Sequence, residues 1–136
     1  MTTDAEALLL DTHAIIWLVD QRLTNRLVEN IAEAAFRGQA FVSPISAWEI
    51  GLLAKRIVFE GGPLLWFDRL LGGPVRLTPI TPKIAIGASL LPDWTHRDPA
   101  DRILVATARA IGATLVTRDT EILRYGKRGH VNTIAC

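Results

Sequence analysis

Four acidic residues stand where the chain could carry out metal chemistry. Asp11 directly follows a short apolar run, and Asp119 lies two residues beyond another. Glu49 and Asp101 fall in segments with helical spacing, and both take positions on the apolar side of their helix. A carboxylate that faces a core is costly unless it is protonated, paired or bound to a cation. The spacing therefore predicts a partner for these acids.

The available donor atoms favour a hard divalent cation. The only cysteine, Cys136, is the last residue, so neither a disulfide within the chain nor a cysteine-based metal site is expected. Carboxylate oxygens suit Mg²⁺ or Mn²⁺, which keep several water ligands. Such a cation can orient and acidify a water molecule and neutralise the charge that builds up on a phosphate. The acids thus indicate nuclease or phosphatase chemistry.

Helix capping is one alternative explanation for these positions. Asp11, Asp98 and Asp119 each precede an expected helix, where a carboxylate accepts hydrogen bonds from free backbone N–H groups. Asp101 fits the third position of the helix that Asp98 would cap. Taken singly, none of these acids identifies a site.

Ion pairing is the other alternative. Glu49 and Asp101 would face inward, and the arginines that could neutralise them are Arg56, Arg97 and Arg102. Buried acids are often satisfied in this way. Paired acids and metal-bound acids therefore both remain open from the residues alone.

Strands that alternate with helices would position the acids. We expect strands at residues 7–10, 40–42, 114–117 and 131–135, and helices at residues 12–19, 23–37, 45–56, 64–71, 82–91, 99–111 and 119–125. This alternation predicts a three-layer α/β/α sandwich with a mainly parallel sheet. Ligands of such sheets gather beyond the carboxyl ends of the strands, where Asp11 and Asp119 would lie.

The composition of the chain limits the kinds of protein that could carry this site. The 136 residues are 49% hydrophobic, which suits a single domain over residues 1–136 that buries its own core. Lys and Arg total 15 against 14 Asp and Glu, so a nucleic acid would have to bind a local basic patch. We expect no signal peptide and no membrane span, because the first apolar run is short and has no basic residues before it. Together with the lone cysteine, this favours a cytoplasmic protein.

Four segments together resemble a known family. LLLDTHAIIWL, SPISAWEI, HRDPADRILVATARAIG and TLVTRD surround Asp11, Glu49, Asp101 and Asp119. They resemble, in order and spacing, the four successive motifs of VapC-like PIN-domain proteins, which are toxins of type II toxin-antitoxin systems. No single motif is specific, but four in order span nearly the whole chain.

The resemblance implies an activity and partners. It implies a PIN-like sandwich, Mg²⁺- or Mn²⁺-dependent cleavage of single-stranded RNA, a homodimer and a cognate antitoxin. It maps the catalytic and metal-binding acids onto Asp11, Glu49, Asp101 and Asp119. The carboxylates would hold one or two ions.

Further residues are expected around these ligands. Thr117 matches a family hydroxyl position near the metal, although a threonine at a strand end also fits β propensity. Asp98 and His13 are placed beside the ligands, Asp98 because Asp101 has the better helical register. His13 could equally be a packed or solvent-facing residue. Three arginines flank the third and fourth motifs and are expected to hold RNA phosphates, unless they are solvated or paired: Arg97, Arg102 and Arg118.

The apolar run at residues 64–71 has two possible roles. It could cap the core, or it could form, with Leu52 and Leu53, a groove for the apolar segment of an antitoxin.

Two other functions compete with the ribonuclease. A phosphatase or phosphotransfer domain would need paired acids on an early strand and a lysine after a late strand, and the sequence has neither. A non-catalytic RNA- or protein-binding module would use the same fold with its acids as caps. This binding module is the principal alternative.

Overall fold

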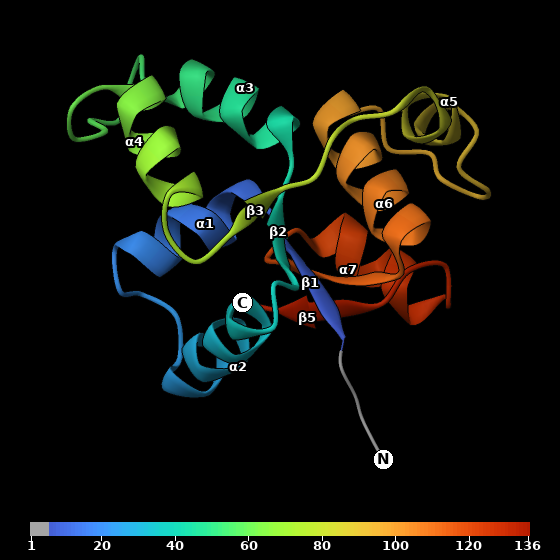
Figure 1. Ribbon diagram of the computed structural model, residues 1–136. Helices are drawn as coiled ribbons and strands as arrows, with labels where there is room; N and C mark the ends of the chain where they lie inside the picture. The colour runs from blue at the N-terminus through green and yellow to red at the C-terminus, as the bar shows by residue number, and fades with distance from the viewer. Residues whose placement is uncertain (1–5) are drawn as a thin grey trace.

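The computed structural model describes residues 6–136, which fold around a five-stranded parallel sheet (Figure 1). The strands are β1 (Ala7–Leu10), β2 (Ala40–Val42), β3 (Arg76–Leu77), β4 (Ala113–Thr117) and β5 (Thr133–Ala135). Their order is β3-β2-β1-β4-β5, and each neighbouring pair is parallel. The predicted parallel α/β class is confirmed.

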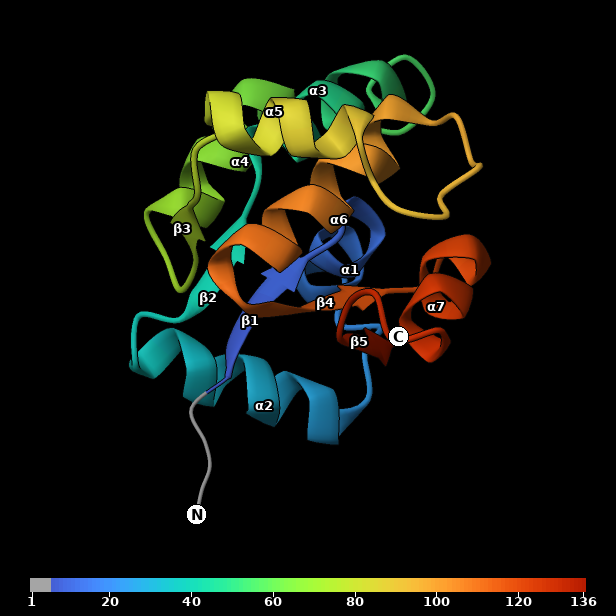
Figure 2. The same ribbon diagram turned by 90° about the vertical axis from the view of Figure 1, so that its right-hand side faces the viewer.

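Helices cover both faces of the sheet (Figures 1 and 2). The helices are α1 (Thr12–Val19), α2 (Asn25–Phe36), α3 (Pro44–Leu53), α4 (Pro63–Leu71), α5 (Pro82–Ser89), α6 (Pro99–Ile111) and α7 (Thr120–Lys127). Buried residues of α1, α2 and α4 share one core cluster, and those of α5, α6 and α7 share the other. The result is the expected three-layer sandwich.

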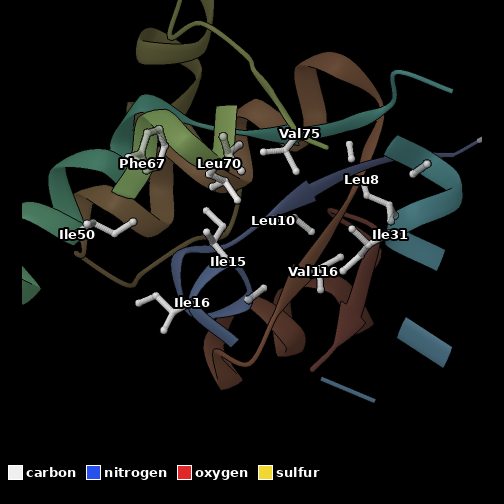
Figure 3. Close-up of a cluster of buried hydrophobic side chains, with 14 of the residues drawn as sticks. Leu8, Leu10, Ile15, Ile16, Ile31, Ile50, Phe67, Leu70, Val75 and Val116 are labelled. Carbon is white, nitrogen blue, oxygen red and sulfur yellow. The ribbon is translucent and has the colours of Figure 1, made fainter. Parts of the chain in front are cut away.

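Alternation along the first strand supplies both clusters. Leu8 and Leu10 belong to the cluster under α1, α2 and α4, whereas Leu9 belongs to the cluster under α5, α6 and α7. Successive side chains of a strand point to opposite faces, so a run that is apolar throughout must be covered on both sides. Figure 3 shows Leu8 and Leu10 among the side chains of the first cluster.

Ten of the 22 ends of the expected elements differ from the observed ones, by one to three residues. Helices 12–19 and 99–111 are confirmed to the residue. The helix expected from residue 23 begins at Asn25, because the Thr24 side chain caps it by accepting a hydrogen bond from the backbone N–H of Leu27 (3.3 Å). Strand β3 was not predicted, because a two-residue exposed edge strand has too few residues to show a period.

The chain connections diverge between β1 and β4, which is where the crevice of an open parallel sheet forms. From β1 the sheet grows toward β2 and β3, and from β4 it grows toward β5, so the connections diverge at the β1–β4 pair. In open parallel sheets, ligands bind at such a point, beyond the carboxyl ends of the strands. Asp11 follows β1 at this edge and donates its backbone N–H to the carbonyl of Val116 in β4 (2.9 Å).

The N-terminal prediction extends beyond the described residues. The expected lack of a signal peptide rests in part on residues 1–5, which lie outside the part of the chain that the structure describes. Among residues 6–136, no helix is both long and apolar enough to cross a membrane.

Candidate active site

Asp11 is held by hydrogen bonds to both of its carboxylate oxygens. It is only 6% exposed and stands between β1 and α1. Oδ1 accepts a hydrogen bond from the backbone N–H of Thr12 (2.6 Å), and Oδ2 accepts one from the hydroxyl of Thr117 at the end of β4 (2.6 Å). Burial raises the pKa of Asp11, and these two bonds partly oppose the rise. The carboxylate is therefore oriented before any ligand binds.

Thr117 links Asp11 to Asp119. Its hydroxyl oxygen accepts a hydrogen bond from the backbone N–H of Asp119 (3.0 Å) while its proton goes to Asp11. Asp119 Oδ1 in turn accepts hydrogen bonds from the N–H groups of Glu121 (2.7 Å) and Ile122 (3.2 Å), which caps α7. The predicted capping role of Asp119 is confirmed. In the described part of the chain, the capping hydrogen bonds use only Oδ1 of its carboxylate.

Asp101 lies at the centre of the negative charge. It is 7% exposed, in the first turn of α6. Burial first, and then repulsion by Asp119, Asp98 and Asp11, raise the pKa of Asp101 to about 8. A hydrogen bond with Asp119 also favours the protonated form, because two carboxylates can bond in this way only through a shared proton. The site thus holds more negative charge than it can keep without a proton or a cation.

Glu49 joins the cluster from α3 through a chain of hydroxyls. The Thr12 hydroxyl donates to Glu49 and also lies 3.0 Å from the hydroxyl oxygen of Ser46. Since a hydroxyl has one proton, Ser46 must donate to Thr12 if Thr12 donates to Glu49. Burial raises the pKa of Glu49, the Thr12 bond lowers it, and the charges of Asp11, Asp98 and Asp119 raise it further.

The roles of Thr12 and Ser46 were not predicted. The available signals were that Thr12 directly follows Asp11 and that Ser46 precedes Glu49 by one helical turn. Sequence does not show that α1 and α3 meet at this point, which depends on helix packing.

The ion-pair alternative for the inward acids is not observed. Within residues 6–136, no arginine lies within ion-pair distance of Glu49 or Asp101. The guanidinium of Arg102 instead donates to the backbone carbonyls of His96 (3.1 Å) and Ala88 (3.1 Å). The acids are left without a basic residue of the kind that was expected to neutralise them.

His96 was overlooked as a site residue. Its Nε2 lies 3.2 Å from Oδ2 of Asp101. One ligand atom each from His96, Asp98 and Asp101 lie within 4.8 Å of one another. Asp98 itself is exposed and caps α6 by accepting a hydrogen bond from the N–H of Ala100 (2.9 Å). Asp98 therefore lies directly beside Asp101.

The remaining predicted residues surround the cluster. His13 is exposed, and its charge lowers the pKa of nearby Asp11. Arg97 and Arg118 are exposed, and the Arg118 guanidinium lies over the ring of Trp17, 4.6 Å from its centroid. Arg102 is half-buried and tied to backbone carbonyls, which leaves Arg97 and Arg118 as the more accessible cations.

The donor set fits a hard divalent cation. Carboxylates from four separate elements converge at one edge of the sheet, and burial and mutual repulsion raise the pKa of three of them. Oxygen donors of this kind are the ligands that Mg²⁺ and Mn²⁺ prefer. The fold and the site together define a class of protein: a parallel α/β sandwich with an acidic cluster at the β1–β4 crevice.

Comparison with known proteins places the chain in a family. The PIN domain matches residues 8–128, so the chain belongs to the PIN-domain family. It is 36% identical over 118 residues to Ribonuclease VapC22 of Mycobacterium tuberculosis (strain ATCC 25618 / H37Rv), covering 84% of this chain and 88% of that protein. The resemblance drawn from the four motifs is confirmed.

Solved structures with low sequence identity share the fold. DNA-bound VapBC from Salmonella typhimurium matches with a TM-score of 0.74 at 15% identity, covering 96% of this chain and 98% of that chain. VapBC2 from Rickettsia felis, bound to a DNA fragment from its promoter, matches with a TM-score of 0.73 at 14% identity, covering 95% and 98%. At these identities the matches establish the PIN-like sandwich.

Proposed function

We propose that this protein is a Mg²⁺- or Mn²⁺-dependent endoribonuclease that cleaves single-stranded RNA and acts as the toxin of a toxin-antitoxin pair. The observation that carries the proposal is the convergence of Asp11, Glu49, Asp101 and Asp119 with no arginine to neutralise Glu49 or Asp101 in the described chain. Similarity to a protein named as a VapC ribonuclease supports the choice of RNA as substrate.

The four acids would hold the cation. When bound, the ion supplies a polarised water and neutralises charge on the phosphodiester. Thr117 and the N–H of Thr12 keep the Asp11 carboxylate in one orientation, and the Thr12 hydroxyl does the same for Glu49. Because the pKa of Asp101 is about 8, the cluster retains a proton at neutral pH until a cation replaces it. Arg97 and Arg118, which are exposed, would hold RNA phosphates.

The test compares the wild type with Asp11→Asn and Asp101→Asn. Each protein is expressed inducibly in bacteria, growth is followed, and purified protein is assayed on single-stranded RNA with Mg²⁺, with Mn²⁺ or with excess chelator. We expect the wild type to arrest growth and to cut RNA only with metal, and both variants to lose at least about a hundredfold in rate.

Asp68→Asn is the matched control, because Asp68 is an exposed acid of α4 that makes no contact with the cluster. It should arrest growth and cut RNA as the wild type does. Folded Asp11→Asn and Asp101→Asn proteins that match the wild type would instead mean that the carboxylates are structural. The alternative, a non-catalytic RNA- or protein-binding module, would then be favoured.

A cognate antitoxin is the proposed protein partner, and α3 and α4 offer it a surface. These helices pack against each other. Apolar side chains on them and on the intervening loop remain exposed: Trp48, Leu52, Ile57, Val58, Leu64 and Leu65. Phe67 and Leu70 are buried in the core, which confirms the core-capping role for these two side chains. The antitoxin-binding role of the run at residues 64–71 is proposed for its exposed residues, Leu64 and Leu65.

A double variant, Leu64→Ser with Leu65→Ser, tests this surface. We expect it to keep RNA cleavage and to escape neutralisation when the cognate antitoxin is co-expressed, because apolar contact area is lost. Growth arrest and co-purification of the two proteins are the readouts. Neutralisation equal to that of the wild type would place the antitoxin elsewhere.

We also propose that the protein forms a homodimer and acts in the cytoplasm. Light scattering on the purified protein tests the dimer, for which twice the chain mass is expected. A monomer mass at micromolar concentration would contradict it.

A further inference from the structure

His96 brings an imidazole nitrogen to the edge of the acidic cluster. Its side chain is 38% exposed, whereas that of Asp101, which it faces, is 10% exposed. The imidazole therefore lies between the buried acid and solvent. Its Nε2, 3.2 Å from Asp101 Oδ2, is the atom turned toward the cluster.

The position of His96 is set by three helices. Its carbonyl accepts a hydrogen bond from Nε of Arg102 in α6, and the same guanidinium reaches the carbonyl of Ala88 in α5. Its ring packs edge-on against Trp94, with centroids 5.9 Å apart, and Trp94 packs in the same way against Tyr125 of α7 at 4.8 Å. A side chain anchored in this way can act as a preorganised ligand.

The separations fit ligands of one cation. In octahedral coordination at about 2.1 Å, adjacent ligand atoms lie about 3.0 Å apart and opposite ones about 4.2 Å. The 3.2 Å between His96 Nε2 and Asp101 Oδ2 matches an adjacent pair. An atom of Asp98 lies within 4.8 Å of the other two ligand atoms. The exposed Asp98 side chain would have to turn inward to bring this atom within about 4.2 Å, the separation of opposite ligands.

A nitrogen donor changes which cation the site prefers. Mg²⁺ binds almost only to oxygen. Mn²⁺ also prefers oxygen, but as a transition-metal ion it accepts an imidazole nitrogen more readily than Mg²⁺ does. A site made of carboxylates alone would discriminate less between Mn²⁺ and Mg²⁺.

We propose that His96 Nε2 is a ligand of the divalent cation, together with Asp98 and Asp101, and that this nitrogen makes the site select Mn²⁺ over Mg²⁺. The inference rests on the metal-dependent function proposed above. It adds to that function two ligands, His96 and Asp98, and an ion preference.

Pulsed electron paramagnetic resonance of Mn²⁺ tests the ligand directly. Metal-free full-length protein, with any histidine tag removed, is loaded with less than one equivalent of Mn²⁺. We expect a ¹⁴N coupling typical of coordinated imidazole in the wild type and its loss in His96→Ala. His130→Asn is the matched control, since His130 faces Asp93, outside the cluster, and it should keep the coupling.

Calorimetric titration with Mn²⁺ and with Mg²⁺ tests the preference. In His96→Ala we expect Mn²⁺ affinity to fall at least about tenfold and Mg²⁺ affinity to change far less. His96→Asp replaces the nitrogen with an oxygen donor, so it should still bind both ions but with a reduced preference for Mn²⁺. This second variant separates the role of the nitrogen from any loss of folding.

The outcomes separate the inference from the function on which it rests. If the wild type binds Mn²⁺ without a nitrogen coupling, or if His96→Ala keeps the wild-type ratio of affinities, His96 merely pairs with Asp101 and the inference is overturned. The acidic site would stand in either case. If neither ion binds the wild type, the metal-dependent function itself fails as well.

Discussion

At the scale of single residues, hydroxyl groups determine how the acids are presented. Thr117 and Thr12 each donate a hydrogen bond to a carboxylate, Thr117 to Asp11 and Thr12 to Glu49. Both bonds favour the ionised form and so oppose the effect of burial on the pKa of the acid. Two small neutral side chains thus help to keep buried acids able to bind a cation.

Replacement of Thr117 tests this role. In Thr117→Val, the pKa of Asp11 should rise further, because a bond that lowers it is lost. We expect cation affinity to fall about ten- to a hundredfold and its dependence on pH to move to higher pH, as measured by titration at pH 6, 7 and 8.

The matched control lies on the same strand. Thr114 is also buried in β4, but its hydroxyl lies 3.2 Å from Glu6 Oε2, away from the cluster. Thr114→Val should bind the cation as the wild type does. Equal behaviour of the two variants would show that the bond from Thr117 to Asp11 has no effect on the site.

At the scale of elements, helix starts place three of the acids. Asp11, Asp98 and Asp119 are the N-caps of α1, α6 and α7. The same carboxylate can accept bonds from free N–H groups and still direct an oxygen to the crevice. Capping and cation binding, which compete as explanations of the sequence, are compatible in the folded chain.

Two substitutions of Asp119 separate the two roles. Serine can cap a helix but cannot bind a cation through a charged group, whereas alanine can neither cap the helix nor bind a cation. We expect Asp119→Ala to be about 1 kcal/mol less stable to urea than Asp119→Ser, and both to lose RNA cleavage. Relief of the repulsion with Asp101 is common to both variants and cancels in the comparison. A Ser variant that still cleaves RNA at the wild-type rate would show that Asp119 is only a cap.

At the scale of the whole molecule, the fold holds together charges that repel one another. Four elements meet at the crevice, where burial first, and then repulsion by the neighbouring acids, raise the pKa of Asp101 to about 8. In the unfolded chain the same group ionises near 3.8. Between these values the folded state binds more protons than the unfolded state, so a rise in pH favours unfolding.

The stability of the metal-free protein should therefore fall as pH rises from about 4 to about 8. In Asp101→Asn this group no longer titrates, so melting temperature should depend less on pH. At pH 8 in chelator, we expect the variant to melt at least about 3 °C above the wild type. Mg²⁺ should raise the wild-type melting temperature more than that of the variant.

Scanning calorimetry at pH 5, 6, 7 and 8 provides the measurement, with Asp68→Asn as the control for loss of an exposed acid. Parallel curves for the wild type and Asp101→Asn would contradict the raised pKa. They would also remove the reason to expect strong cation binding at the cluster.

Local sequence patterns predicted much of the secondary structure and the helix caps. The helices at residues 12–19 and 99–111, the caps at Asp11, Asp98 and Asp119 and the buried first strand depend on interactions within a few residues of the chain. Such interactions leave periodicities and residue types that sequence displays. Inward register likewise marked Asp101, which the structure shows to be buried.

Contacts between elements that are distant in the sequence could not be predicted from local patterns. The bond from Thr12 to Glu49, the approach of His96 to Asp101 and the use of Arg102 to tie His96 to α5 all depend on how separate helices pack. Strand β3 escaped as well, because it depends on pairing with β2 rather than on any pattern of its own.

The sequence by itself determined the class of fold and the family, and it singled out the four candidate acids, because apolar spacing and motif order are properties of the chain. Only the tertiary structure decided which groups neutralise, orient and accompany those acids. The reason is physical: the pKa of a carboxylate and its partners depend on distances and burial, and these exist only once α3, α6 and α7 have closed around the ends of β1 and β4.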